Sequence, residues 1–113
     1  MTDYSNGLYM THMFVDDKGR PEGGTTQGPG LLVSWQRGPL KDSASGEENP
    51  RNGAFVMDLI MATIQRIEFY QRSEFACDEN AEALLHLNQA YDVLQSRIDR
   101  RTAEGTQGTH KGA

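Results

Sequence analysis

The sequence predicts an α+β protein in which a short N-terminal antiparallel β-meander precedes a long antiparallel two-helix hairpin. Three observations support this fold class. Residues 1–40 hold short runs of strand formers separated by glycine-containing turns, residues 41–52 are polar without periodicity, and residues 53–103 carry two apolar stripes with helical spacing. The chain has 113 residues, which suits a single domain or one subunit of an oligomeric assembly. The tail, residues 104–113, is expected to be disordered unless another segment holds it.

Two segments of the N-terminal part predict strands. Residues 8–15 are rich in strand-forming side chains, and the following Asp17-Lys18-Gly19 predicts a turn because glycine accepts a left-handed backbone. Residues 23–30 contain four glycines and are expected to form a second break. Residues 31–36 then predict a short strand that ends at Gly38-Pro39. We therefore expect a meander of two or three strands.

The first helix is expected to begin near Asn52, whose side chain can cap the free amides of the first turn. Its apolar stripe repeats at alternating spacings of four and three residues. The stripe is formed by Val56, Ile60, Thr63, Ile67 and Tyr70, with Phe55, Leu59 and Ile64 beside it. A break over residues 71–77 follows.

The second helix is expected to begin after Asp78, which is a candidate cap. Its stripe repeats at spacings of three and four residues and is formed by Leu84, Leu87, Tyr91, Leu94 and Ile98. The short connection makes the two helices antiparallel. A hairpin of two helices buries only one seam, so we expect it to pack on the meander, on a second subunit, or on both.

Composition excludes several classes of function. The net charge is −5, from 16 acidic and 11 basic side chains, which disfavours a long nucleic acid as partner. No apolar run approaches the roughly 20 residues that cross a bilayer, and the N-terminus lacks the pattern of a secretory signal. The only cysteine, Cys77, excludes an internal disulfide and is expected to be a small buried side chain. A cytoplasmic protein without membrane contact is predicted.

The sequence carries no recognisable catalytic or metal-binding motif. His12, His86 and His110 are far apart and lack ligand spacing. The glycine-rich residues 23–30 lack the Lys-Ser/Thr ending of a phosphate loop. We therefore expect no enzymatic activity, no cofactor and no metal ion.

Two groups of side chains could bind a ligand. Arg97, Arg100 and Arg101 end the second helix, where they either stabilise the helix dipole or bind phosphate with their planar forks. Tyr70 and Phe75 flank the bend with Asn80. Spacing alone favours core packing for the two rings, but aromatic rings also stack on bases, and an amide reads a base edge.

Trp35 has two interpretations of its own. It stands directly before the predicted strand end, where a tryptophan commonly anchors a sheet edge. The same position would also let its ring form the wall of a binding pocket.

The order of these motifs resembles a family of phage proteins, the Thoeris anti-defence signal sponges, within the wider group of cyclic-nucleotide sponges with a helical-hairpin domain. The resemblance covers roughly residues 30–110. It is carried by residues 33–40, Asn52-Gly53-Ala54-Phe55, Tyr70-Gln71, residues 75–81, Arg97 with Arg101, and Gly108-Thr109-His110. The sequence departs from the family's usual pattern at Ile98, at Arg100, and at Thr106-Gln107 in the tail.

The resemblance implies an α+β subunit that forms a dimer or a hexamer and does no chemistry. It implies that the partner is a cyclic ADP-ribose isomer, with cyclic di- or trinucleotides held by some relatives, in the cytosol of the infected host. The family's ligand-contacting residues correspond to Tyr70, Asn80 and Arg97, and our candidate site adds Arg101, Phe75 and Trp35. Two alternatives remain open at this point: an adaptor protein that pairs through its hairpin, and a weak nucleotide hydrolase.

Overall fold

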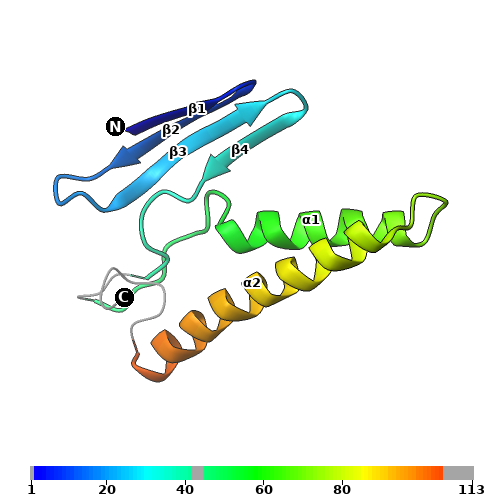
Figure 1. Cartoon of the computed structure of the whole chain (residues 1–113). Helices are drawn as coiled ribbons and strands as arrows, with labels where there is room; N and C mark the ends of the chain where they lie inside the picture. Colours follow the sequence, from blue (N-terminus) through cyan, green and yellow to red (C-terminus); the bar gives the residue numbers. More distant parts are fainter. Residues whose placement is uncertain (1, 42–44, 106–113) are drawn as a thin grey trace. The chain divides into compact units, whose positions relative to one another are not determined.

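A computed structural model describes residues 2–41 and 45–105 and confirms an antiparallel sheet followed by two helices (Figure 1). The sheet has the order β1-β2-β3-β4. Its strands are β1 (Thr2–Asn6), β2 (Tyr9–Val15), β3 (Pro21–Gly28) and β4 (Leu31–Trp35). The two helices that follow are α1 (Val56–Gln71) and α2 (Asp78–Ala103). The chain divides into a sheet unit, which reaches Phe55, and a hairpin unit, which begins at Val56. The predicted disorder of the tail beyond Gly105 concerns residues outside the described part.

The meander has four strands, more than the two or three predicted from the sequence. The predicted break at residues 23–30 is wrong, because β3 runs through most of it. Gly24 lies opposite Met13 with φ of 130°, and a side chain there would collide with the backbone of His12. The glycines of β3 therefore permit close strand pairing where the sequence suggested a turn.

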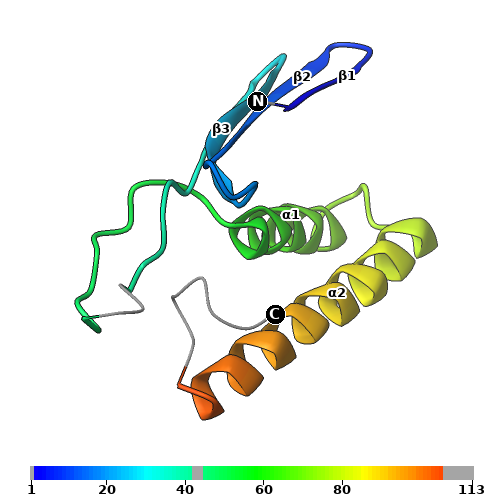
Figure 2. The same ribbon diagram turned by 90° about the vertical axis from the view of Figure 1, so that its left-hand side faces the viewer.

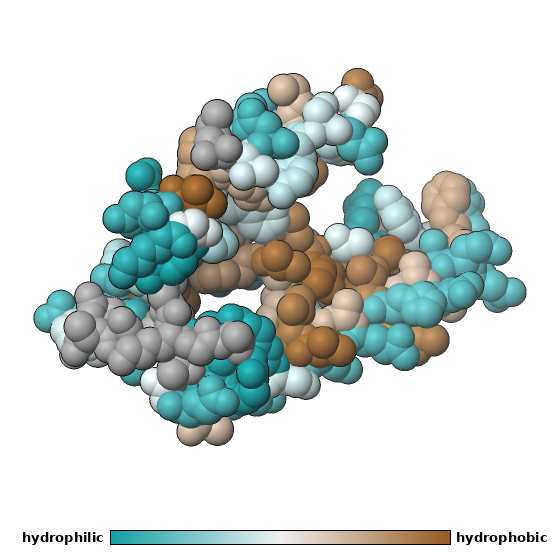
Figure 3. Space-filling model, turned by 60° about the vertical axis from the view of Figure 1, so that its left-hand side comes forward, coloured by the Kyte–Doolittle hydropathy of each residue, from teal (hydrophilic) through white to brown (hydrophobic). Residues whose placement is uncertain are grey.

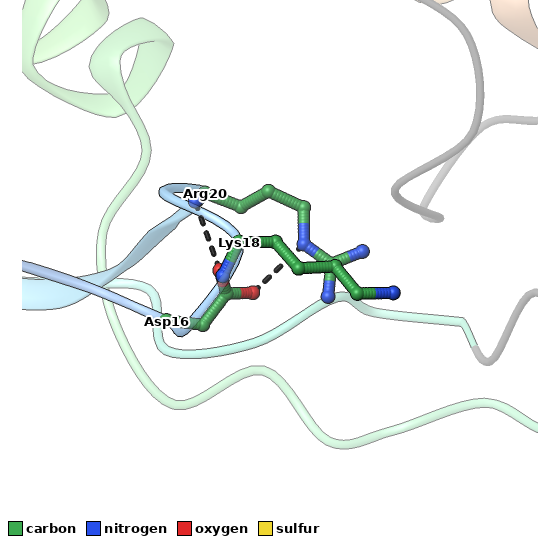
Figure 4. A network of polar contacts seen from close by, with 3 residues as sticks. All are labelled: Asp16, Lys18 and Arg20. Carbon is green, nitrogen blue, oxygen red and sulfur yellow. Dashed lines mark hydrogen bonds and ion pairs between the residues drawn. The ribbon is translucent and has the colours of Figure 1, made fainter.

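The predicted turn after β2 is confirmed, and Asp16 organises it (Figure 4). One carboxylate oxygen of Asp16 accepts hydrogen bonds from the backbone N–H groups of Lys18 and Arg20, each at 2.9 Å. The other oxygen accepts from Nε of Arg20 at 2.8 Å. These contacts, with the backbone N–H of Arg20 first, lower the pKa of Asp16, and partial burial opposes them.

Trp35 anchors the sheet through a chain of side-chain hydrogen bonds. Its Nε1 donates to Oγ1 of Thr26 at 2.8 Å, and that hydroxyl lies 2.9 Å from the hydroxyl of Thr11. The neighbouring Val33 is the one buried apolar side chain among the described residues of the sheet unit. These contacts correspond to the predicted role of Trp35 as a sheet anchor.

Asn52 does not cap α1, which begins four residues later, at Val56. Its side-chain amide instead pairs with the backbone of Arg37, accepting from N at 2.8 Å and donating to O at 3.0 Å. Oε1 of Gln36 accepts in turn from the backbone N–H groups of Asn52 and Gly53. A side chain at Gly53 would collide with the backbone of Trp35. These residues therefore close the base of the loop, whose described residues 45–52 are exposed as predicted.

The helices of the hairpin run in opposite directions and diverge away from the bend that joins them (Figures 1 and 2). The predicted stripe of α2 is confirmed, because all five of its residues are partly buried. The predicted stripe of α1 is partly wrong. Val56 and Thr63 are exposed, whereas Ile64 is the most buried apolar side chain, at 3% exposure. The buried face of α1 is therefore rotated around the helix from the one the spacing suggested.

Both units leave large apolar side chains in contact with solvent. Within the described residues, only Val33 and Ile64 are buried hydrophobic side chains. Leu8, Leu32 and Val93 are each about 70% exposed. The space-filling view shows hydrophobic side chains on the surface of the molecule (Figure 3). Each unit by itself therefore has a small core.

Candidate functional site

Gln71, the last residue of α1, ties the bend between the helices together. Its side-chain amide donates to the carbonyl of Cys77 at 3.1 Å and accepts from the N–H of Cys77 at 3.0 Å. Inside this loop the hydroxyl of Ser73 donates to the carbonyl of Tyr70 and accepts from the N–H of Phe75. The bend is thus closed by side chains that replace backbone partners, which fixes its conformation without a buried core.

The bend holds Phe75 out into solvent. The side chain is 66% exposed, so core packing, which spacing alone favoured, is wrong for this ring. Asn80 donates from Nδ2 to the carbonyl of Phe75 at 3.2 Å, and within the described residues its Oδ1 accepts no hydrogen bond. The amide of Asn80 therefore has one structural partner, and its oxygen retains the capacity to accept a hydrogen bond.

The start of α2 differs from the sequence prediction at two neighbouring residues. Cys77 is exposed, so its predicted burial is wrong. It occupies the N-cap position with an extended backbone, at φ −159° and ψ 166°. Asp78 is the first helical residue and not the cap. Its carboxylate stabilises the helix through the dipole, because the N-terminal end carries partial positive charge.

Tyr70 is partly buried beneath Arg66, which lies one helical turn earlier. The guanidinium carbon of Arg66 lies 4.9 Å from the centre of the Tyr70 ring and 5.3 Å from that of Phe69. Nε of Arg66 donates to the Tyr70 hydroxyl at 3.1 Å. The Tyr70 ring is therefore held by Arg66 and is half-buried.

The last turns of α2 gather positive charge. Arg101 is only 6% exposed, whereas Arg97 and Arg100 are exposed. Burial lowers the pKa of the Arg101 guanidinium, and the charges of Arg97 and Arg100 lower it further, while Glu104 opposes them. An anion bound at this end would relieve the repulsion among these cations.

Within the hairpin unit, one chain does not bring the predicted site residues together. Asn80 and Arg97 lie on the same helix, and their separation of 17 positions corresponds to about 25 Å at 1.5 Å per residue. Tyr70 and Phe75 belong to the bend end with Asn80, and Arg101 belongs to the opposite end. Trp35 belongs to the sheet unit. The sequence reasoning missed Arg66, although its spacing of four from Tyr70 was visible as a helical arginine–aromatic pair.

Within residues 2–41 and 45–105, no three histidine, cysteine or carboxylate side chains are arranged to hold a metal ion. No helix in this part of the chain combines the length and the apolar character needed to cross a membrane.

The described residues define a class of protein: a small α+β protein in which a helical hairpin carries an aromatic bend at one end and clustered arginines at the other. The sequence places it more narrowly. The chain belongs to the Acb2/Tad1 hairpin-domain family, whose model matches residues 34–98. It is 38% identical over 79 residues to "Thoeris anti-defense 1" of Bacillus phage SBSphiJ7. That alignment covers 70% of this chain and 51% of the relative, so the chain spans about half the length of the protein it matches.

Proposed function

We propose that this protein is a phage anti-defence sponge that binds cyclic ADP-ribose-type signalling nucleotides in the infected host cytosol and releases them unchanged. By holding the signal, it would block Thoeris immunity, and cyclic di- or trinucleotides of related defences are further candidate ligands. The observation that carries the proposal is the hairpin of the Acb2/Tad1 family. At one end, the Gln71 side chain closes an aromatic bend by hydrogen bonds to the backbone of Cys77, and at the other end α2 carries three arginines.

The chemistry of the two ends suits the two halves of a nucleotide. Tyr70 and Phe75 offer ring faces on which a base can stack, and Oδ1 of Asn80 can accept a hydrogen bond from an exocyclic amine. Arg97, which is exposed late in α2, offers paired N–H donors for the phosphates, beside Arg100 and the buried Arg101, whose mutual repulsion an anion would lower. In this proposal none of these side chains acts as an acid or base, because the ligand is stored and not converted.

Because the two ends lie about 25 Å apart on α2, we infer that two copies form each site. If two copies pair about a twofold axis with their α2 helices running in opposite directions, the bend of one copy lies beside the arginine end of the other. α2 exceeds α1 by ten residues, so roughly 15 Å of α2, including Leu94 and Ile98, extends past the start of α1. A second hairpin would cover this extension.

The proposal is tested by mixing the purified protein with cyclic ADP-ribose, removing free nucleotide, heating the complex, and identifying what is released by chromatography. A sponge returns the intact nucleotide in an amount close to the number of sites. An enzyme would return a cleaved product, and an adaptor protein would retain nothing.

The adaptor protein is the second candidate, and one observation favours it. Apolar side chains remain exposed on both units, including Leu85 and Val93 of α2. Such a surface suits a protein partner as well as another copy of the chain. If heating releases no nucleotide, pairing through the hairpin becomes the better account.

A further inference from the structure

We propose that Arg66 supplies a phosphate-binding cation at the bend end of the hairpin, so that each copy presents a stacking ring and an anion-binding fork of its own. The inference rests on the proposed nucleotide-binding function and adds a residue to that site. It gives the bend end a positive charge independent of the arginines at the end of α2.

The position of Arg66 is fixed by three contacts from its own helix. Its guanidinium lies within about 5 Å of the ring centres of Phe69 and Tyr70, and the two rings are 6.3 Å apart at an angle of 56°. The hydrogen bond from Nε to the Tyr70 hydroxyl sets the rotation of the fork. An arginine held in this way loses little additional side-chain entropy when it binds an anion.

The charge of Arg66 is not neutralised by a carboxylate within the described residues. The residues three and four positions away on α1 are Ala62, Thr63, Phe69 and Tyr70, and none is acidic. By contrast, Arg20 is engaged in an ion pair with Asp16 in the turn after β2. In a chain with a net charge of −5, an arginine kept clear of acidic neighbours is a concentrated positive charge at the surface.

The geometry favours phosphate over a base as the group that contacts this fork. Nε is occupied by the Tyr70 hydroxyl, and one face of the guanidinium lies over the rings. The two terminal amino groups remain, and their paired N–H donors match the spacing of phosphate oxygens. The Phe75 ring, which the bend holds in solvent, offers a stacking surface for the base of the same ligand.

The test compares binding of cyclic ADP-ribose and of adenosine, which has no phosphate, by titration calorimetry. The variants are Arg66→Gln and Arg72→Gln, which remove the same charge from the same end of the hairpin. Arg72 is exposed, and its backbone N–H donates to the carbonyl of Phe69. Circular dichroism checks that both variants keep the helical content of the wild type.

We expect Arg66→Gln to weaken cyclic ADP-ribose binding about tenfold or more, and Arg72→Gln to change it by less than about twofold. Adenosine should bind both variants as it binds the wild type. Equal cyclic ADP-ribose affinities in the two variants would overturn the role of Arg66 while leaving the sponge intact. An equal loss for adenosine would assign Arg66 to holding Tyr70 and would overturn the phosphate contact. Failure of the wild type to bind cyclic ADP-ribose would overturn the proposed function and this inference together.

Discussion

Replacing Ile64 by alanine tests whether the seam of the hairpin lies where the structure places it. Ile64 is 3% exposed and is the most buried apolar side chain of α1. The substitution removes three carbon atoms, worth about 0.8 kcal/mol each, and the cavity left behind raises the total loss of unfolding free energy to about 2–5 kcal/mol. For a chain of this size, that corresponds to a drop in melting temperature of roughly 10 °C or more.

The assay is urea unfolding followed by far-ultraviolet circular dichroism, with all variants at the same protomer concentration because assembly would couple to unfolding. Val56→Ala is the matched control, since Val56 lies on the same helix and is 56% exposed. Its unfolding free energy should change by less than about 0.5 kcal/mol. If the two variants lose stability equally, Ile64 is not in the seam and the orientation derived for α1 is wrong.

Three further predictions follow from the described residues. The folded pKa of Asp16 lies below its ordinary value of 3.8, so its contribution to stability is present above pH 3.8 and is lost as the pH falls from there through the lowered, folded pKa. Asp16→Asn should therefore flatten the melting-temperature profile between about pH 5 and pH 3, and a profile as steep as the wild type's would contradict the turn network. Leu94→Ala should lower the melting temperature and shift the mass measured by light scattering toward that of the monomer. A wild-type protein that is monomeric at micromolar concentration would contradict assembly through the hairpin. Arg97→Ala should weaken cyclic ADP-ribose binding about 10- to 100-fold with little change in melting temperature, and unchanged affinity would leave Arg97 as a surface charge.

The sequence predicted the fold best where a periodic pattern met a buried surface. The α2 stripe from Leu84 to Ile98 is an example, because half-buried positions recur along that face in the structure. The α1 stripe was less well predicted. Thr63 and Ile64 are adjacent, both fit a helical spacing, and only packing against α2 decides which of them turns inward.

Contacts between distant residues explain most of the remaining differences. β3 contains three glycines, so its strand character comes from pairing with β2 and β4 and not from its own side chains. Asn52 looked like a helix cap because asparagine is common there, but it pairs with Arg37, 15 residues away. Gln71 closes the bend in a similar way. Amide side chains that replace backbone partners leave no periodic pattern to detect.

The sequence predicted which residues belong to the candidate site. It did not predict that these residues are divided between the two ends of the hairpin. The sequence placed Tyr70, Phe75 and Asn80 near the bend and Arg97 and Arg101 late in α2, as the structure has them. Helix length then separates the two groups by about 25 Å, which no count of motifs reveals. The exposure of Phe75 also depends on how the bend is tied, through contacts of single side chains.

The most direct test of the shared site uses two inactive variants, Tyr70→Ala and Arg97→Ala, mixed in equal amounts, unfolded and refolded together. Each should bind cyclic ADP-ribose poorly alone. If one copy supplies the bend and the other the arginine, half of the refolded pairs are mixed, and each mixed pair holds one intact site. Calorimetry should then recover about one quarter of the wild-type sites at wild-type affinity. A mixture that binds no more nucleotide than the separate variants would contradict a sponge site shared between two copies.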